Sequence, residues 1–229
     1  MDIEILHLIE GARQSRGLAV IIDVFRAFTV ECFVMNNGAE SIIPTASKEL
    51  AYSLKTQNND FILMGERHGK ILQGFDYGNS PAQLENVNFS GKTIIHTTSA
   101  GTQGLDNAVN ADEVITGSLV NAKAAAEYIK KKQPQKVSLV CMGLEALSES
   151  EEDTLCAEYI KSLLEGKSMD VQKEIESLKN TSGAKFFNKD LQDVFPEKDF
   201  YLSTQINRFD FVLRLRKENG LNRIVKIPL

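Results

Sequence analysis

Two residues of opposite charge follow a short apolar run near the start of the chain. The run Leu18 to Ile22 contains no polar residue; Asp23 follows it at once, and Arg26 comes three positions later. A carboxylate can hold a cation and a guanidinium can hold an oxyanion, so this pair could take part in binding or catalysis. The structural alternative for Asp23 is the N-cap of a following helix.

Later apolar runs end in a similar way, with polar turns at residues 65–69 and 74–81, 96–102, 116–122 and 142–154. The turn TTSAGT (97–102) is the one richest in hydroxyl groups. Such turns expose backbone N–H groups that suit an anion. Because it matches neither a Walker A loop nor a G-x-G-x-x-G fingerprint, it is a weak signal on its own. The prediction of a site depends on several polar strand ends falling on one side of one sheet.

Five acidic residues at these ends are suited, as hard oxygen ligands, to a magnesium ion. They are Asp23, Glu66, Asp76, Glu152 and Asp153. With three histidines and no ligand-spaced pair among them, zinc or iron is not expected. The structural alternative for SEEDT (150–154) is an ordinary acidic first turn of a helix, stabilised by the helix dipole.

Arginines and polar turn residues complete the candidate site. Arg26 and Arg67 could each hold a phosphate or sulfonate through paired hydrogen bonds. The candidate substrate-binding residues are Arg67, Asn79, Ser80, Thr97, Thr98, Gly101, Thr102, Ser118 and Asn121. We interpret His68 and His96 as structural or surface residues rather than acid–base groups, and Cys141 and Cys156 as core residues rather than nucleophiles.

The elements that must position these residues alternate between short apolar strands and segments of helical period. This alternation predicts an α/β fold: a three-layer α/β/α arrangement with a largely parallel sheet that is mixed at the edge. We expect one domain over residues 1–229, or two lobes that divide near residues 120–135. The tail from Asp199 onward is predicted to form a hairpin or a mixed edge with ENGLN as its turn. The polar stretch Glu165 to Asp193 is the predicted flexible insertion.

The composition excludes some classes of function. The chain has 229 residues and a net charge of −5, with no basic stripe, so nucleic acid is not an expected partner. No apolar run is long enough to span a bilayer, and the N-terminus lacks the basic region of a signal peptide, so no membrane partner is expected. Three cysteines far apart fit free thiols in a reducing compartment, and we expect a cytoplasmic protein. A homodimer is the expected assembly because closed twofold assemblies are the commonest.

An ordered set of motifs resembles the 2-phosphosulfolactate phosphatase family. The motifs are IDVFRA, GERHGKILQGFDYGNSP, TTSAGT, TGSLVNA and SEEDTLCAEYI, and they extend from about Gly17 to Tyr159, with a weaker match at INRFDFV. The resemblance implies an α/β fold and a magnesium-dependent acid phosphatase. In the coenzyme M pathway such an enzyme cleaves 2-phospho-3-sulfolactate to 3-sulfolactate and phosphate. This sequence departs from the family pattern at Phe28, where a small hydroxyl residue is usual, and at Ala100, where Asn is common.

The resemblance implies roles for the candidate residues. Asp23 would bind the metal or attack the phosphorus, with Glu152 or Asp153 as a further metal ligand. Arg26 and the TTSAGT amides would hold anionic oxygens of the substrate, and Arg67 its sulfonate or carboxylate end. If metal-bound water attacks instead, Glu66 or Asp76 would be the base.

Other functions stay open at this point. One is a non-catalytic anion-binding or regulatory module, which would have little use for five carboxylates without a metal. A second is a phosphatase for another small phosphorylated hydroxy acid. A third is an isomerase or lyase acting on such a compound.

Overall fold

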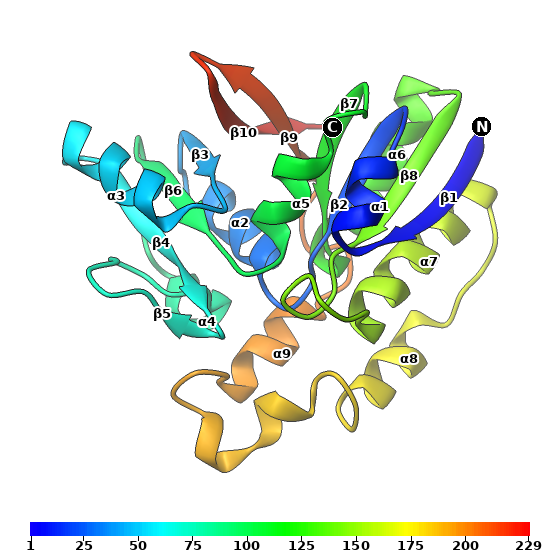
Figure 1. Cartoon of the computed structure of the whole chain (residues 1–229). Coiled ribbons are helices and arrows are strands. Elements are labelled where there is room, and N and C mark those ends of the chain that lie inside the picture. The colour runs from blue at the N-terminus through cyan, green and yellow to red at the C-terminus, as the bar shows by residue number, and fades with distance from the viewer.

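The computed structural model describes all 229 residues and contains one ten-stranded sheet with helices on both faces (Figure 1). The predicted α/β fold class is confirmed. The strands are β1 (Asp2–His7), β2 (Leu18–Ile22), β3 (Ser41–Pro44), β4 (Ile62–Arg67), β5 (Lys70–Ile71), β6 (Thr93–Thr97), β7 (Glu113–Gly117), β8 (Lys136–Cys141), β9 (Phe211–Glu218) and β10 (Leu221–Pro228). The α-helices are α1 (Leu8–Gln14), α2 (Ala27–Asn36), α3 (Lys48–Gln57), α4 (Pro81–Leu84), α5 (Gly101–Asn107), α6 (Ala122–Lys132), α7 (Glu151–Glu165), α8 (Val171–Leu178) and α9 (Glu197–Ser203). Three 3-10 turns are η1 (Leu119–Asn121), η2 (Ala184–Phe187) and η3 (Lys189–Leu191).

The sheet consists of two groups of parallel strands joined by a hairpin. One group is β1-β8-β2-β7 and the other is β3-β6-β4, and the hairpin of β9 and β10 lies between them. The predicted turn lies at Asn219 and Gly220, whose φ angles of 52° and 79° suit a tight hairpin connection. The tail thus forms the predicted hairpin but lies in the middle of the sheet and not at an edge, and a further antiparallel pairing occurs at the β5 edge.

The sheet twists strongly across this hairpin. Three antiparallel pairings separate β7 from β3, so a flat sheet would place the carboxyl ends of the two parallel groups on opposite sides. In this structure the two sets of carboxyl ends meet. The amide of Gly101, just beyond β6, lies 2.9 Å from Asp23 Oδ2, just beyond β2. The right-handed twist of successive strands, which is largest in two-stranded ribbons, accounts for the rotation. In Figure 1 the hairpin lies at the top, and the strand ends that carry the polar turns converge below it.

Strand β2 is apolar throughout because both of its faces are covered. Ala19 and Ile21 pack in the core cluster that includes α1 and α5, whereas Val20 and Ile22 pack in the cluster that includes α6 and α7. All five residues of the strand are buried. A strand without alternation is typical of a parallel sheet between two helical layers.

The second parallel group is also covered on both faces. One face of β3, β6 and β4 packs against Ala51 and Leu54 of α3, and the other belongs to the cluster that contains α2 and α4. Helix α3 begins after Ser47, an N-cap whose hydroxyl accepts the amide of Leu50 at 3.1 Å.

The segment from Glu165 to Asp193, predicted as a flexible insertion, forms helix α8 and the turns η2 and η3. Val171, Ile175 and Leu178 are buried at helical spacing against the cluster that includes α7, which explains why this polar stretch folds. Together with α9 the segment lies below the strand ends in Figure 1. Phe186 of this segment is fully buried.

The three cysteines, Cys32, Cys141 and Cys156, are free and buried, and burial raises the pKa of each thiol. This confirms the interpretation of Cys141 and Cys156 as core residues. None of the helices combines the length and the apolar character needed to cross a bilayer.

Candidate active site

A small pocket of about 120 Å³ lies where the ends of β2, β4, β6 and β8 meet. Its wall carries an unusual number of ionisable side chains for its size: Asp23, Arg26, Glu66, His68, Glu145, Glu152, Asp153 and Lys185. Asn79 and Thr98 also line it. The predicted convergence of the strand ends thus holds for seven of the predicted site residues, namely Asp23, Arg26, Glu66, Asn79, Thr98, Glu152 and Asp153.

Asp23 is fixed by backbone amides from two different loops. Its Oδ1 accepts the amide of Ala27 at 3.1 Å, and its Oδ2 accepts the amide of Gly101 at 2.9 Å. A Cβ atom at position 101 would lie only 2.9 Å from that oxygen, so glycine allows α5 to begin this close to the carboxylate. The TTSAGT turn therefore contributes an amide to Asp23.

Asp153 and Glu66 are held in the same manner. The Asp153 carboxylate accepts the amides of Val24 and Gly143, both at 2.8 Å, and so connects α7 to the ends of β2 and β8. The Glu66 carboxylate accepts the amides of Ser99 and Gly69, both at 2.7 Å. Each of these carboxylates thus ties together two chain segments while it lines the pocket.

Glu152 differs because one of its carboxylate oxygens, Oε2, is buried and has no hydrogen-bond partner. Only 5% of the residue is exposed. A buried carboxylate oxygen without a partner is costly, and a bound cation would compensate it. Mg²⁺ takes one or two protein carboxylates and completes its shell with water and phosphate oxygens. Glu152 and Asp23 fit that requirement, but no group of three His, Cys, Asp or Glu side chains is placed to hold a metal ion, so the predicted trio with Asp153 does not form a cage.

Burial and neighbouring charges act strongly on the carboxylates. Burial raises the pKa of Asp23 to about 7, with Glu66 and Glu152 adding to the rise and the Ala27 and Gly101 amides opposing it. Burial, Glu152 and Asp23 likewise raise the pKa of Asp153 well above its usual range. A cluster of carboxylates with raised pKa values is typical of sites that bind a cation or an ionised substrate.

We expect the protein to be more stable at pH 5 than at pH 8 when divalent cations are chelated. Asp23 keeps its proton in the folded chain up to about pH 7 but loses it near pH 4 when unfolded, so the free energy of unfolding falls as the pH rises between these values. From pH 5 to pH 8 the loss from Asp23 is about 2–3 kcal/mol. Thermal unfolding in EDTA across this pH range measures it. Asp23→Asn should flatten the profile and Asp193→Asn, an exposed control, should not; an unchanged profile in Asp23→Asn contradicts the expectation.

Arg26 is less available to a ligand than the sequence suggests. Its Nη1 donates to Asp199 Oδ2 at 2.6 Å and to the carbonyl of Val194 at 2.9 Å. Both side chains of the Arg26–Asp199 pair are almost fully buried. Asp199 also accepts the Ser80 hydroxyl at 2.8 Å, so the predicted substrate-binding Ser80 is engaged in this network. Arg26 still lines the pocket, but its charge is neutralised by Asp199.

Asn79 connects the pocket to a buried histidine. His96 Nε2 lies 3.2 Å from Asn79 Oδ1, and His96 Nδ1 lies 2.9 Å from Glu31 Oε1. His96 does not line the pocket, and its two partners hold the ring in the core between α2 and β6. The interpretation of His96 as structural is consistent with this geometry.

Several predicted residues are placed elsewhere. Arg67 donates to the carbonyls of Glu66 and Ala46, both at 2.7 Å, and to the Thr97 hydroxyl, and it does not line the pocket. Asp76 accepts the amide of Leu63 and also lies outside the pocket. Six other predicted substrate-binding residues are absent from the pocket wall: Ser80, Thr97, Gly101, Thr102, Ser118 and Asn121. Ser118 and Asn121 cap each other at the start of η1, and Thr102 bonds to Thr98. The geometry does not support contacts of these residues with a ligand.

The two departures from the family pattern have different surroundings. Phe28 is fully buried, and its ring packs beneath Gly101, in the core rather than at the pocket wall. Ala100 lines the pocket, so a methyl group stands in the wall at this position.

Sequence reasoning missed three functional candidates. Asp199 and Lys185 come from the segment that lacked any motif, and only the fold brings them to the strand ends. The third is the contact between His68 Nδ1 and Glu145 Oε1, at 2.7 Å, which joins the loops after β4 and β8 beside the pocket. No sequence signal identified Lys185. For Asp199 the only hint was its place directly before the apolar residues of the DFYL stretch.

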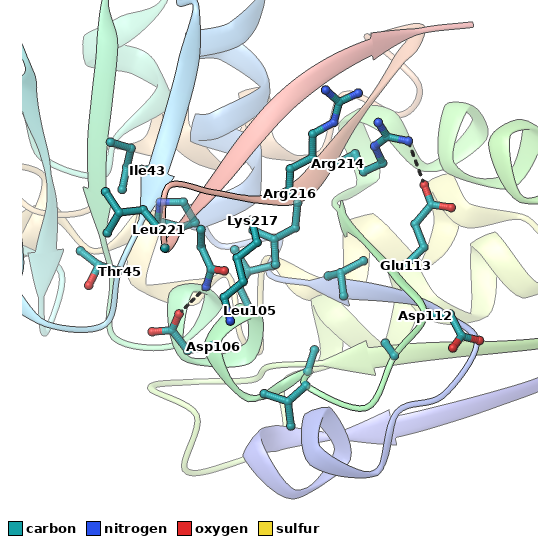
Figure 2. A pocket seen from close by; sticks show the side chains of 18 of the residues that line it. Ile43, Thr45, Leu105, Asp106, Asp112, Glu113, Arg214, Arg216, Lys217 and Leu221 are labelled. Carbon is teal, nitrogen blue, oxygen red and sulfur yellow. Dashed lines mark hydrogen bonds and ion pairs between the residues drawn. The ribbon is translucent and has the colours of Figure 1, made fainter.

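A larger hollow of about 750 Å³ lies beside the β9–β10 hairpin (Figure 2). Figure 2 shows Arg214 paired with Glu113. Asn222 donates to Asp106 at 2.9 Å. None of the predicted site residues lines this hollow. We therefore take the smaller pocket at the strand ends as the candidate active site.

Buried carboxylates and loop amides around a pocket at the carboxyl ends of parallel strands define an enzyme that handles a small ionised substrate. Residues 3–218 match the family described as 2-phosphosulpholactate phosphatase. The chain belongs to this family of phosphoric monoester hydrolases.

Relatives named "Probable 2-phosphosulfolactate phosphatase" support this assignment. The protein from Bacillus subtilis (strain 168) is 31% identical over 209 residues, which is 91% of each chain. The one from Caldanaerobacter subterraneus is 34% identical over 218 residues, 89% of each chain. The one from Carboxydothermus hydrogenoformans is 41% identical over 165 residues, 72% of this chain and 68% of the relative.

Proposed function

We propose that this protein hydrolyses 2-phospho-3-sulfolactate to 3-sulfolactate and inorganic phosphate, with Mg²⁺ bound at Asp23 and Glu152. This is the reaction type of coenzyme M biosynthesis. Besides the family membership, one observation carries the proposal. Glu152 Oε2 is buried without a hydrogen-bond partner, and it lines the same pocket as Asp23, whose carboxylate is held by two backbone amides. When bound there, the ion would neutralise negative charge on the phosphoryl oxygens.

The chain's own groups would position the reaction. The two amide contacts of Asp23 keep its carboxylate in one orientation and leave further lone pairs for the pocket. An Asp23 oxygen would form a bond to phosphorus while the ester P–O bond breaks, and the leaving alkoxide would take a proton from the Glu66 carboxyl group. Water would then attack the aspartyl phosphate, give its proton to Glu66 and release inorganic phosphate. Asn79 and the Thr98 hydroxyl, which also line the pocket, would donate to substrate oxygens.

Phosphate release from the purified protein tests the proposal. The panel is 2-phosphosulfolactate, 2-phospholactate, phosphoglycerate and p-nitrophenyl phosphate, each with Mg²⁺ and after chelation. We expect the highest kcat/KM with 2-phosphosulfolactate and a loss of at least about a hundredfold on chelation, because charge neutralisation supplies much of the catalysis.

Other results of this panel separate the alternatives. Release from the other esters only would keep a phosphatase and reject this substrate. No release from any ester, with 2-phosphosulfolactate still raising the unfolding temperature, would indicate a binding module. Conversion of the substrate without free phosphate would indicate an isomerase or lyase.

A further inference from the structure

The pocket contains one cationic side chain that has no partner. Lys185, from η2, lines the pocket, and its Nζ makes neither a hydrogen bond nor an ion pair within 4 Å. The other cationic groups of the wall are engaged: Arg26 with Asp199, and His68 with Glu145. Lys185 is therefore the pocket's free positive charge.

Aromatic rings surround this half-buried ammonium group. Its Nζ lies 5.5 Å from the ring centres of Phe186 and Phe195 and 5.9 Å from that of Phe25. Burial lowers the pKa of Lys185, while Glu152 is the nearby charge that raises it most. An ammonium group that lies against aromatic rings and is half-buried gains more from a bound anion than one fully in solvent does.

Lys185 also enters from a different direction than the carboxylates. Asp23, Glu66 and Asp153 stand at strand ends or on the helix that follows, whereas Lys185 belongs to the segment that covers those ends (Figure 1). A substrate whose phosphoryl group lies at Asp23 would extend the rest of its structure toward this covering segment. That part of 2-phosphosulfolactate carries a carboxylate and a sulfonate, and an acidic pocket wall would repel both.

We propose that Lys185 Nζ binds the sulfonate of the substrate and thereby selects for a phosphoester that carries a second acid group. This inference rests on the proposed function, because it names the part of the same substrate that Lys185 would hold. Arg67, which the sequence had suggested for this role, faces away from the pocket. The aromatic rings restrict the space open to the lysine side chain, which lowers the conformational entropy lost when the anion binds.

The test compares substrates in Lys185→Met, which removes the charge and keeps the length of the side chain. The substrates are 2-phosphosulfolactate, 2-phospholactate, which has the carboxylate without the sulfonate, and p-nitrophenyl phosphate, which has neither. We expect the kcat/KM ratio of 2-phosphosulfolactate to each of the other two to fall at least about tenfold, mainly through KM. Lys185→Arg should restore most of the ratio. Lys189→Met, an exposed lysine four residues away, is the matched control and should leave the ratio unchanged.

Other outcomes reject the inference. Equal losses on all three substrates would mean that Lys185 acts on the phosphoryl group or on folding. A fall against p-nitrophenyl phosphate alone would assign Lys185 to the carboxylate. An unchanged ratio would remove it from recognition.

A second measurement does not need turnover. 3-Sulfolactate should raise the unfolding temperature of the wild-type protein and of Lys189→Met, but not that of Lys185→Met. If the wild-type protein releases phosphate from no ester, the proposed function fails, and this binding measurement still decides the role of Lys185. Equal stabilisation of wild type and Lys185→Met by 3-sulfolactate overturns the inference.

Discussion

Replacing Asp23 with asparagine is expected to lower kcat with 2-phosphosulfolactate by a factor of about a thousand or more. The substitution keeps the size of the side chain but removes the charge that would attack phosphorus or hold the cation. It also turns one hydrogen-bond acceptor into a donor that faces a backbone amide, either that of Ala27 or that of Gly101. Steady-state phosphate release under saturating Mg²⁺ measures the effect, and the unfolding temperature confirms that the variant is folded.

Asp76→Asn is the matched comparison. The sequence marked both aspartates as catalytic candidates, but Asp76 lies outside the pocket, where it accepts the amide of Leu63. Its substitution should therefore leave kcat within about twofold of the wild-type value, since it touches no reacting group. A near-normal rate for Asp23→Asn, or a collapse for Asp76→Asn, would show that the pocket at the strand ends has been wrongly identified.

The largest effect on stability is expected for Asp199→Asn. This residue is fully buried and accepts from Arg26, from the Ser80 hydroxyl and from the amide of Ala82 at 2.9 Å. Removing its charge leaves the Arg26 guanidinium buried without a counter-ion, which typically costs about 3–5 kcal/mol. Urea unfolding at pH 7 measures the loss.

Two controls define that result. Asp193→Asn, in the same segment but exposed, should change the free energy of unfolding by less than about 0.5 kcal/mol. Arg26→Met combined with Asp199→Asn should be more stable than Asp199→Asn alone, because no buried charge then lacks a partner. A double variant less stable than the single one would mean that the pair contributes mainly through packing around Phe195.

The strands and the longer helices were predictable because their patterns are local. The five-residue apolar run of β2, the Ser47 cap of α3 and the Asn219–Gly220 turn each specify one element without tertiary information. Short elements such as α1 and α8 were missed, since seven or eight residues give few periods of the helical repeat. The insertion of the tail hairpin between the two parallel groups depends on pairing partners that lie 97 to 182 residues away in the sequence, so no local pattern could indicate it.

The candidate site divides in a similar way. Asp23, Glu66 and Asp153 were found because each lies at or beyond the carboxyl end of an apolar strand. Parallel strands bring such positions together. Arg67 was misplaced although the period of a strand could have shown it: side chains alternate along β4, so Glu66 and Arg67 face opposite sides. Lys185 belongs to a segment with no strand before it, and only the packing of α8 and Phe186 places it at the pocket.

The hairpin at the centre of the sheet has a consequence for biosynthesis. Both parallel groups leave the ribosome before residues 211–228, and β9 and β10 are the only strands that join them. Until then β7 and β3 are open edges with unpaired backbone groups, a state prone to association with other chains. The nascent chain therefore holds all the carboxylates of the pocket before it has the sheet that brings them together. Its dependence on chaperones should be greatest in that interval.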